Sequence, residues 1–243
     1  MFYITGDTHY NIDNLKVKTW FEANKAKLTM KDYLIIAGDF LTPCFGKIPE
    51  TDRLLDYYSE MNCMILFVDG NHENFAELNA LPVETWNGGK VHKLRDNVIH
   101  LMRGQVYNID DITIFTLGGA VSPDRAMRVE GVTWFKEEDI SDEEYQEAKT
   151  NLEKVNNKVD LVITHTVSNN FLKCRLFSAT EYNESFAGNI NKVLDEIELR
   201  LECKDWYFGH FHIDKDFKDS NKHVMFNRII KIDAKDLKQS SYN

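Results

Sequence analysis

The stretch that decides the fold is residues 64–81, MILFVDGNHENFAELNAL. It begins with five apolar residues, typical of a buried strand, and ends in a short helical pattern from residue 74 to residue 81. Gly70-Asn71-His72-Glu73 lies between them, at a strand end where open α/β sheets bind ligands. Asn71 offers an oxygen for a metal or a phosphate, and His72 can carry a proton near neutral pH. Taken alone, such a tetrapeptide is more often an ordinary polar turn.

Two earlier junctions repeat this pattern. An apolar strand at residues 2–5 ends in Gly6-Asp7-Thr8-His9, and a second at residues 32–37 ends in Gly38-Asp39. The polar residues after the three glycines, at positions 7, 39 and 71, are 32 residues apart, a plausible length for βαβ units. Right-handed crossovers would place the three strand ends side by side. Asp7 and His9 would then project to the same side of an extended segment and form half of a metal site.

The later strands also end in polar residues. A strand at 160–164 leads to His165, and one at 206–208 leads to Gly209-His210-Phe211-His212, whose two histidines would share one side of an extended segment. The loop after a strand at 112–117 carries Arg125 and Arg128. Because a guanidinium matches phosphate oxygens, both are candidate phosphate-binding residues, although a solvated loop explains each equally well.

The remaining pattern predicts helices and further strands. A capping box of Ser141 and Glu144 indicates the start of one helix, and Asp110-Asp111 is expected to turn a hairpin. The expected helices are 13–27, with Leu15, Trp20, Phe21 and Leu28 inward, 51–61, 141–157 and 189–201. The further strands are 98–102, 105–109, 213–218, 222–226 and 228–233.

Composition limits the classes of function. The chain has 243 residues, 43% of them hydrophobic, and a net charge of −10. This suits one packed domain over residues 1–243, with 166–188 as a lid or specificity segment and 234–243 as a frayed tail. An acidic chain argues against nonspecific binding to nucleic acids or membranes, but not against an anionic substrate, because bound divalent ions reverse the local charge. Without a membrane-length apolar run, a basic leader or paired cysteine motifs, we expect a cytoplasmic protein with reduced thiols.

Together these motifs resemble a known family. The order Gly-Asp-Thr-His, Gly-Asp, Gly-Asn-His-Glu, Thr-His and Gly-His-Phe-His, from Gly6 to His212, is similar to that of the calcineurin-like metallophosphoesterases. The resemblance implies an α/β (α+β) fold, a four-layer αββα sandwich of two mixed β-sheets with flanking helices. It also implies hydrolysis of a phosphate ester by a hydroxide that bridges two divalent metal ions.

The resemblance assigns roles to individual residues. One ion would be held by Asp7, His9, Asp39 and His212, and the other by Asp39, Asn71, His165 and His210. Asp39 would bridge the two ions, Asn71 would also contact the substrate, and His72 would be the general acid that protonates the leaving group. Mn²⁺ is the expected metal, and Fe or Zn²⁺ also suits these ligands.

The chain departs from the protein-phosphatase branch of that family. Asp69 stands where those members have an arginine, and no second aspartate follows Asp39 closely. A phosphoprotein substrate is therefore disfavoured, and Asp69 is a candidate partner for His72 in place of that second aspartate. We expect a phosphomonoesterase or phosphodiesterase that acts on a small or nucleotide-like substrate. The alternatives are a nucleic-acid phosphodiesterase or nuclease, which the negative charge disfavours, and a non-catalytic metal-binding scaffold of the same fold, which the filled ligand positions disfavour.

Overall fold

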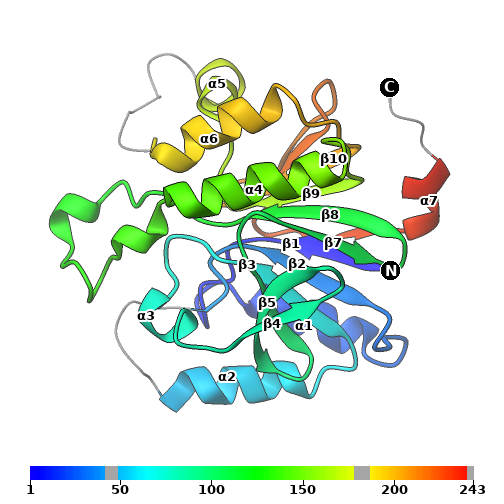
Figure 1. Cartoon of the computed structure of the whole chain (residues 1–243). Coiled ribbons are helices and arrows are strands. Elements are labelled where there is room, and N and C mark those ends of the chain that lie inside the picture. Colours follow the sequence, from blue (N-terminus) through cyan, green and yellow to red (C-terminus); the bar gives the residue numbers. More distant parts are fainter. Residues whose placement is uncertain (42–48, 178–186, 240–243) are drawn as a thin grey trace.

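The computed structural model describes residues 1–41, 49–177 and 187–239. These residues form two β-sheets that pack face to face between helices (Figure 1). The first sheet has, in order across it, β13 (Ile230–Ile232), β1 (Phe2–Thr5), β2 (Tyr33–Ala37), β3 (Met64–Val68), β6 (Val98–Leu101), β5 (Gly89–Arg95) and β4 (Val83–Trp86). The second has β11 (Lys215–Phe217), β12 (Lys222–Val224), β10 (Asp205–Phe208), β9 (Leu161–Thr164), β8 (Ile112–Leu117) and β7 (Gln105–Ile109).

Helices cover the outer face of each sheet (Figure 1). α1 and α2 lie on the first sheet, and α4 and α6 lie on the second. The helices are α1 (Leu15–Asn24), α2 (Pro49–Ser59), α3 (Phe75–Leu78), α4 (Asp142–Lys154), α5 (Asn169–Phe171), α6 (Asn189–Glu198) and α7 (Ala234–Gln239). A π-helical turn, Leu172–Leu176, follows α5, and short 3-10 turns cover Arg125–Met127 and Lys136–Glu138.

The two-residue period of the strands explains the layers. In β2, Ile35 packs into the core between the two sheets, whereas Ile36 faces the core under α1 and α2. In β9, Ile163 packs between the sheets, whereas Val162 faces the core under α4 and α6. Strands buried on both faces are apolar throughout. The fold is therefore the expected αββα sandwich of two mixed sheets.

Strand order brings the glycine turns together. β1, β2 and β3 are adjacent and parallel, so the turns after them lie at one edge of the first sheet, as expected. β9 and β10 are likewise adjacent and parallel in the second sheet. In each sheet, the residues that follow the central parallel strands therefore lie together at one edge.

Several local expectations were wrong. The first helix covers only Leu15–Asn24, and Leu15 is 73% exposed while Val17 is fully buried. The hairpin of β4 and β5 was not expected; Val83 is exposed and gave a weak strand signal, although Asn87-Gly88 turns it at positive φ. Residues 234–239 are not a frayed tail, because α7 buries Leu237 against the core between the sheets.

The structure bears on some of the remaining expectations and leaves others untested. Within the described ranges, no helix is long and apolar enough to cross a membrane. Cys63, Cys174 and Cys203 are free thiols. Residues 178–186 of the expected lid lie outside the described residues, as do 42–48 and 240–243. The single-domain organisation remains a prediction.

Candidate metal centre

Four acidic and imidazole side chains converge where the two sheets meet. Asp7 and His9 follow β1, Asp39 follows β2, and His212 lies beyond β10. One ligand atom from each lies within 4.8 Å of those from the other three. Nε2 of His9 is 3.2 Å from Oδ2 of Asp39, and Nε2 of His212 is 3.5 Å from Oδ1 of Asp7. Carboxylate and imidazole donors at this spacing suit a divalent ion.

A second group shares Asp39 with the first. Nε2 of His165 is 3.3 Å from Oδ2 of Asp39 and 3.1 Å from Oδ1 of Asn71. Nδ1 of His210 lies 2.9 Å from the same Asn71 oxygen. The amide oxygen and two imidazoles therefore surround a point next to Asp39. The structure thus brings together all seven side chains predicted to be metal ligands, and their role as ligands remains a prediction.

The outer nitrogens of two histidines are already held by oxygen acceptors. Nδ1 of His165 donates to the carbonyl oxygen of Ala37 at 2.9 Å, and Nδ1 of His9 lies 2.9 Å from Oδ2 of Asp13. These contacts leave Nε2 of each ring directed at Asp39. Such outer contacts fix the ring and the tautomer of a metal-bound histidine. The donor set therefore fits two ions that share Asp39.

The backbone at these residues is not extended, which corrects the expected geometry. Asp7, His9, Asp39, His210 and His212 have φ between 41° and 69°, in the left-handed region. Each such residue costs roughly 1–3 kcal/mol, and such strain concentrates at functional sites. The paired residues converge because the chain turns there, not because alternate residues of a strand share a face.

Glycines make room for the converging side chains. A Cβ on Gly38, whose φ is +89°, would lie 2.0 Å from Nδ1 of His165. A Cβ on Gly70 would lie 2.1 Å from Oδ1 of Asp39. Glycine before Asp39 and before Asn71 is therefore required by space, and at Gly38 also by backbone conformation.

Burial and charge shift the pKa values of the centre. Burial opposes ionisation of Asp39, but the neighbouring His165 and His72 outweigh it and hold the pKa of Asp39 well below its usual value. Burial lowers the pKa of His165, but Asp39 raises it more, to about 10. His9 behaves similarly, and its pKa rises to about 9. Burial and the nearby His165 lower the pKa of His210 to about 3.

Comparison with known proteins agrees with this geometry. Residues 1–214 match a family model described as calcineurin-like phosphoesterase. The chain belongs to the calcineurin-like phosphoesterase family. This phosphoesterase is therefore a phosphoester hydrolase, and its family and its Asp/His cluster, buried except at His212, indicate divalent metal ions. A search of curated proteins found no match.

His72 of this phosphoesterase lies beside the centre. Its backbone N–H donates to Oδ1 of Asp39 at 2.9 Å, and its Nδ1 lies 3.3 Å from a terminal nitrogen of Arg128. Because Arg128 can only donate, the neutral ring carries its proton on Nε2. Burial and Arg128 lower the pKa of His72, while Asp39 opposes the shift.

Two substrate-side expectations need revision. Asp69 is not the partner of His72, because its carboxylate is bound by Arg103 and His100 instead. Arg128 reaches the centre through His72, whereas Arg125 lines a different cavity of about 270 Å³ beside Trp134 and Lys136. None of the predicted metal ligands is among the described residues that line this cavity.

Other supporting residues were missed. Ser122 accepts a hydrogen bond from Nδ2 of Asn71 at 3.1 Å and so directs the amide oxygen towards the histidines. The ammonium of Lys16 binds the carbonyl oxygens of Gly6 and Asp7, and burial lowers its pKa to about 8. Asp13 had a usable signal, because it lies four residues after His9. Ser122 and Lys16 belong to none of the sequence motifs.

The last residue of the deciding tetrapeptide joins two of the glycine turns. Glu73 is buried, and its carboxylate accepts from the backbone N–H groups of Gly70 at 2.7 Å and Phe40 at 2.8 Å. Burial, together with the charges of Asp39 and Asp69, raises its pKa. Glu73 therefore holds the turn that carries Asn71 against the turn that carries Asp39.

Proposed function

We propose that this protein acts in the cytoplasm and hydrolyses a phosphate ester of a small or nucleotide-like molecule. It would use two divalent metal ions, and Mn²⁺ is the expected metal. The observation that carries the proposal is the position of Asp39. Its carboxylate lies between the group of Asp7, His9 and His212 and the group of Asn71, His165 and His210. When bound, two ions would neutralise charge on the phosphate and lower the pKa of a water molecule that attacks phosphorus.

The protein's own groups would handle the leaving group and orient the phosphate. His72 carries its proton on Nε2, since Arg128 occupies the Nδ1 side. When a second proton makes this ring an imidazolium, its Nε2 proton would pass to the oxygen of the departing alcohol, which leaves poorly as an alkoxide, and the ring would return to its neutral form. The Arg128 guanidinium, paired with Asp124 at 2.8 Å and bound to the carbonyl oxygen of Thr133, is fixed where it would bind a phosphate oxygen.

The test is hydrolysis by the metal-stripped protein before and after Mn²⁺ is added back. p-Nitrophenyl phosphate and bis-p-nitrophenyl phosphate separate monoesterase from diesterase activity. We expect Mn²⁺-dependent turnover that Asp39→Asn abolishes. If Mn²⁺ binds but no ester of a panel including nucleotides is cleaved, the protein is a metal-binding scaffold and the proposal is wrong.

A second comparison isolates the role of His72. Phenol, with a pKa of about 10, needs a proton more than p-nitrophenol does. His72→Ala should therefore slow hydrolysis of phenyl phosphate by at least about tenfold more than that of p-nitrophenyl phosphate. Equal losses on both esters would show that His72 does not protonate the leaving group.

A further inference from the structure

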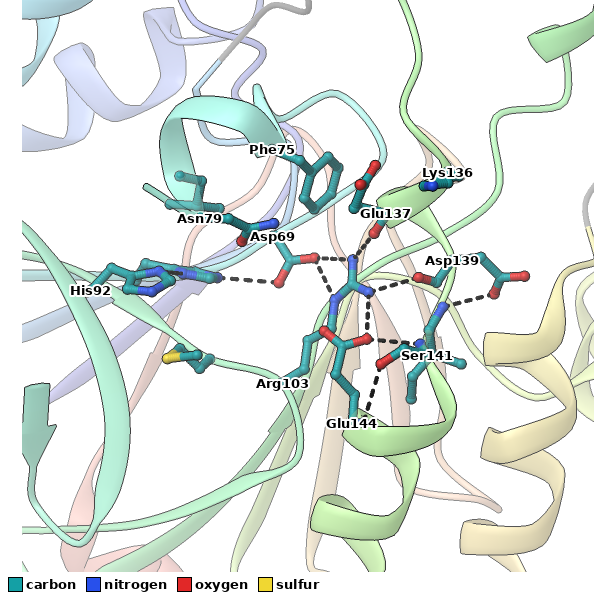
Figure 2. A pocket seen from close by; sticks show the side chains of 14 residues that line it. Asp69, Phe75, Asn79, His92, Arg103, Lys136, Glu137, Asp139, Ser141 and Glu144 are labelled. Atoms are coloured by element: carbon teal, nitrogen blue, oxygen red, sulfur yellow. Dashed lines mark hydrogen bonds and ion pairs between the residues drawn. The ribbon is translucent and has the colours of Figure 1, made fainter. Parts of the chain in front are cut away.

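Asp69 lies between the end of β3 and the Gly70-Asn71-His72-Glu73 turn and is almost completely buried. Nε and one terminal nitrogen of Arg103 donate to its Oδ2 at 2.8 and 2.6 Å. Nε2 of His100 lies 3.1 Å from its Oδ1. Figure 2 shows Arg103 between Asp69 on one side and the segment with Glu137 and Asp139 on the other. A charge buried this deeply is held only by such complete pairing.

Arg103 also binds a second loop. Its other terminal nitrogen donates to the carbonyl oxygen of Asp139 at 2.9 Å, and the terminal nitrogen that binds Asp69 also donates to the carbonyl oxygen of Glu137 at 2.7 Å (Figure 2). Between them, the Glu138 carboxylate accepts the backbone N–H of Ser122 at 3.1 Å. Ser122 in turn orients Asn71. Arg103 therefore acts on Asn71 by two routes. One runs through Asp69, whose backbone leads into the turn that carries Asn71. The other runs through the bound loop, whose Glu138 holds Ser122, the hydrogen-bond partner of the Asn71 amide.

The chain is also tightly packed at this point. The backbone N–H of Gly119, after β8 of the second sheet, donates to the carbonyl oxygen of Asp69 at 2.8 Å. A Cβ on Gly118 would lie 2.3 Å from Oδ1 of Asp69. Asp69 is thus where the turn after β3 meets the second sheet, and a shift there would move Asn71 and His72 relative to His165 and His210.

We propose that Asp69 and Arg103 are positioning residues of the metal centre, which hold Asn71 and His72 at the meeting edge of the two sheets. The proposal rests on the proposed function. Outer residues that orient metal ligands typically contribute 10- to 100-fold to metal affinity or activity. Neither residue touches the predicted metal position, so each acts through the turn and through Ser122.

A cavity of about 480 Å³ lies beside the pair, lined by Phe75, His92, Met102 and Ser141 among others. The charges of Asp69, Arg103 and Glu144 that face it are bound to one another, so we assign them to holding the loops rather than to a ligand. The cavity also gives water access to Asp69 when Arg103 is shortened. We therefore expect Arg103→Lys to fold.

The test is calorimetric titration of metal-stripped protein with Mn²⁺. Arg103→Lys and Asp69→Asn should weaken the affinity for at least one of the two ions by about 10- to 100-fold. At saturating Mn²⁺, kcat on p-nitrophenyl phosphate should fall about tenfold or more, with KM changed less than about twofold. Wild-type affinity for both ions in the two folded variants would overturn the proposal.

Asp160→Asn is the matched control. Asp160 lies just before β9, at the strand end opposite His165, and forms a largely but less deeply buried ion pair with Lys204 at 2.9 Å. It should lose stability without a change in Mn²⁺ affinity; an equal loss of affinity would show a general effect of destabilisation and overturn the proposal. If the wild type binds two ions but cleaves no ester, the proposed function fails, and the comparison of affinities still decides the positioning role. If the wild type binds no Mn²⁺, both fail.

Discussion

At the scale of single residues, His9 and His165 hold protons that a metal ion must displace. Without metal, Asp39 outweighs the effect of burial and raises the pKa of His9 to about 9 and that of His165 to about 10. Both rings are therefore protonated at neutral pH. A metal ligand must be neutral, so each ion competes with a proton.

This competition predicts the pH dependence of metal binding. Raising the pH from 6 towards 9 should strengthen Mn²⁺ binding, and close to two protons should be released per chain at pH 7. Calorimetry in buffers with different ionisation enthalpies measures the released protons directly. Binding without proton release would contradict the contacts of Asp39 with the two rings.

Arg128 is the residue that we propose as a contact for the phosphate, because it reaches His72 beside the centre. Arg128→Ala should raise KM by about 10-fold or more, because a charge-assisted hydrogen bond contributes roughly 1.5–3 kcal/mol. Arg125→Ala is the comparison, since Arg125 lines a different cavity, and it should change KM less. Unchanged kinetics for Arg128→Ala on every ester that the wild type cleaves would remove this assignment.

At the scale of elements, β5 and β6 pair two histidines directly across the sheet. His92 and His100 are register partners, and their Nδ1 atoms lie 3.1 Å apart. Because Nε2 of His100 donates to Asp69, its neutral Nδ1 accepts, and His92 donates from Nδ1. Burial and the nearby His100 lower the pKa of His92 to about 4.

His92 should therefore make the fold sensitive to acid. Between pH 6.5 and 4 the unfolded chain binds a proton at His92 that the folded chain does not, so stability falls as the pH falls through this window. Because His92 lines the cavity beside Asp69, water screens its charge, and the loss should be roughly 1–2 kcal/mol. Urea unfolding of wild type and His92→Gln at pH 7 and pH 4.5 measures it. Gln can donate the same hydrogen bond without titrating, so the variant should lose less stability; an equal loss would refute the role of His92.

The elements also show how far sequence patterns could predict this molecule. Strands with five buried residues in succession, such as β2 and β3, were predicted within one residue, because nothing competes with their burial. The ends of half-exposed elements were not, as at Leu15 in α1. Most of the predicted ligand positions came from glycine turns after parallel strands, and their role as ligands stays a prediction. Ser122 and Arg103 act through contacts across loops, and no periodic pattern records such contacts.

At the scale of the whole molecule, the centre joins the two sheets. Asp7, His9, Asp39 and Asn71 follow strands of the first sheet, whereas His165, His210 and His212 follow strands of the second. Below this edge the sheets are held together by an apolar core. At the edge itself, charged and polar groups face each other, so bound ions would complete the contact between the sheets.

Metal should therefore stabilise the whole fold and not only the site. An ion that binds only the folded state contributes about 2.7 kcal/mol when its concentration is 100 times its Kd. For a chain of 243 residues, 1 kcal/mol shifts Tm by roughly 2–4 °C. Saturation of the stripped protein with Mn²⁺ should therefore raise Tm by about 5–10 °C, measured by scanning calorimetry.

Asp39→Asn is the control for this stabilisation. The amide keeps the shape of the shared carboxylate but removes the charge that both groups of ligands face, so Mn²⁺ should shift the Tm of this variant little. Mg²⁺ at the same concentration separates a specific effect from a general ionic one, because Mg²⁺ prefers oxygen ligands to imidazoles. An equal rise in Tm for the wild type and Asp39→Asn would mean that Mn²⁺ acts elsewhere on the molecule. The two sheets would then be joined at this edge without a metal ion.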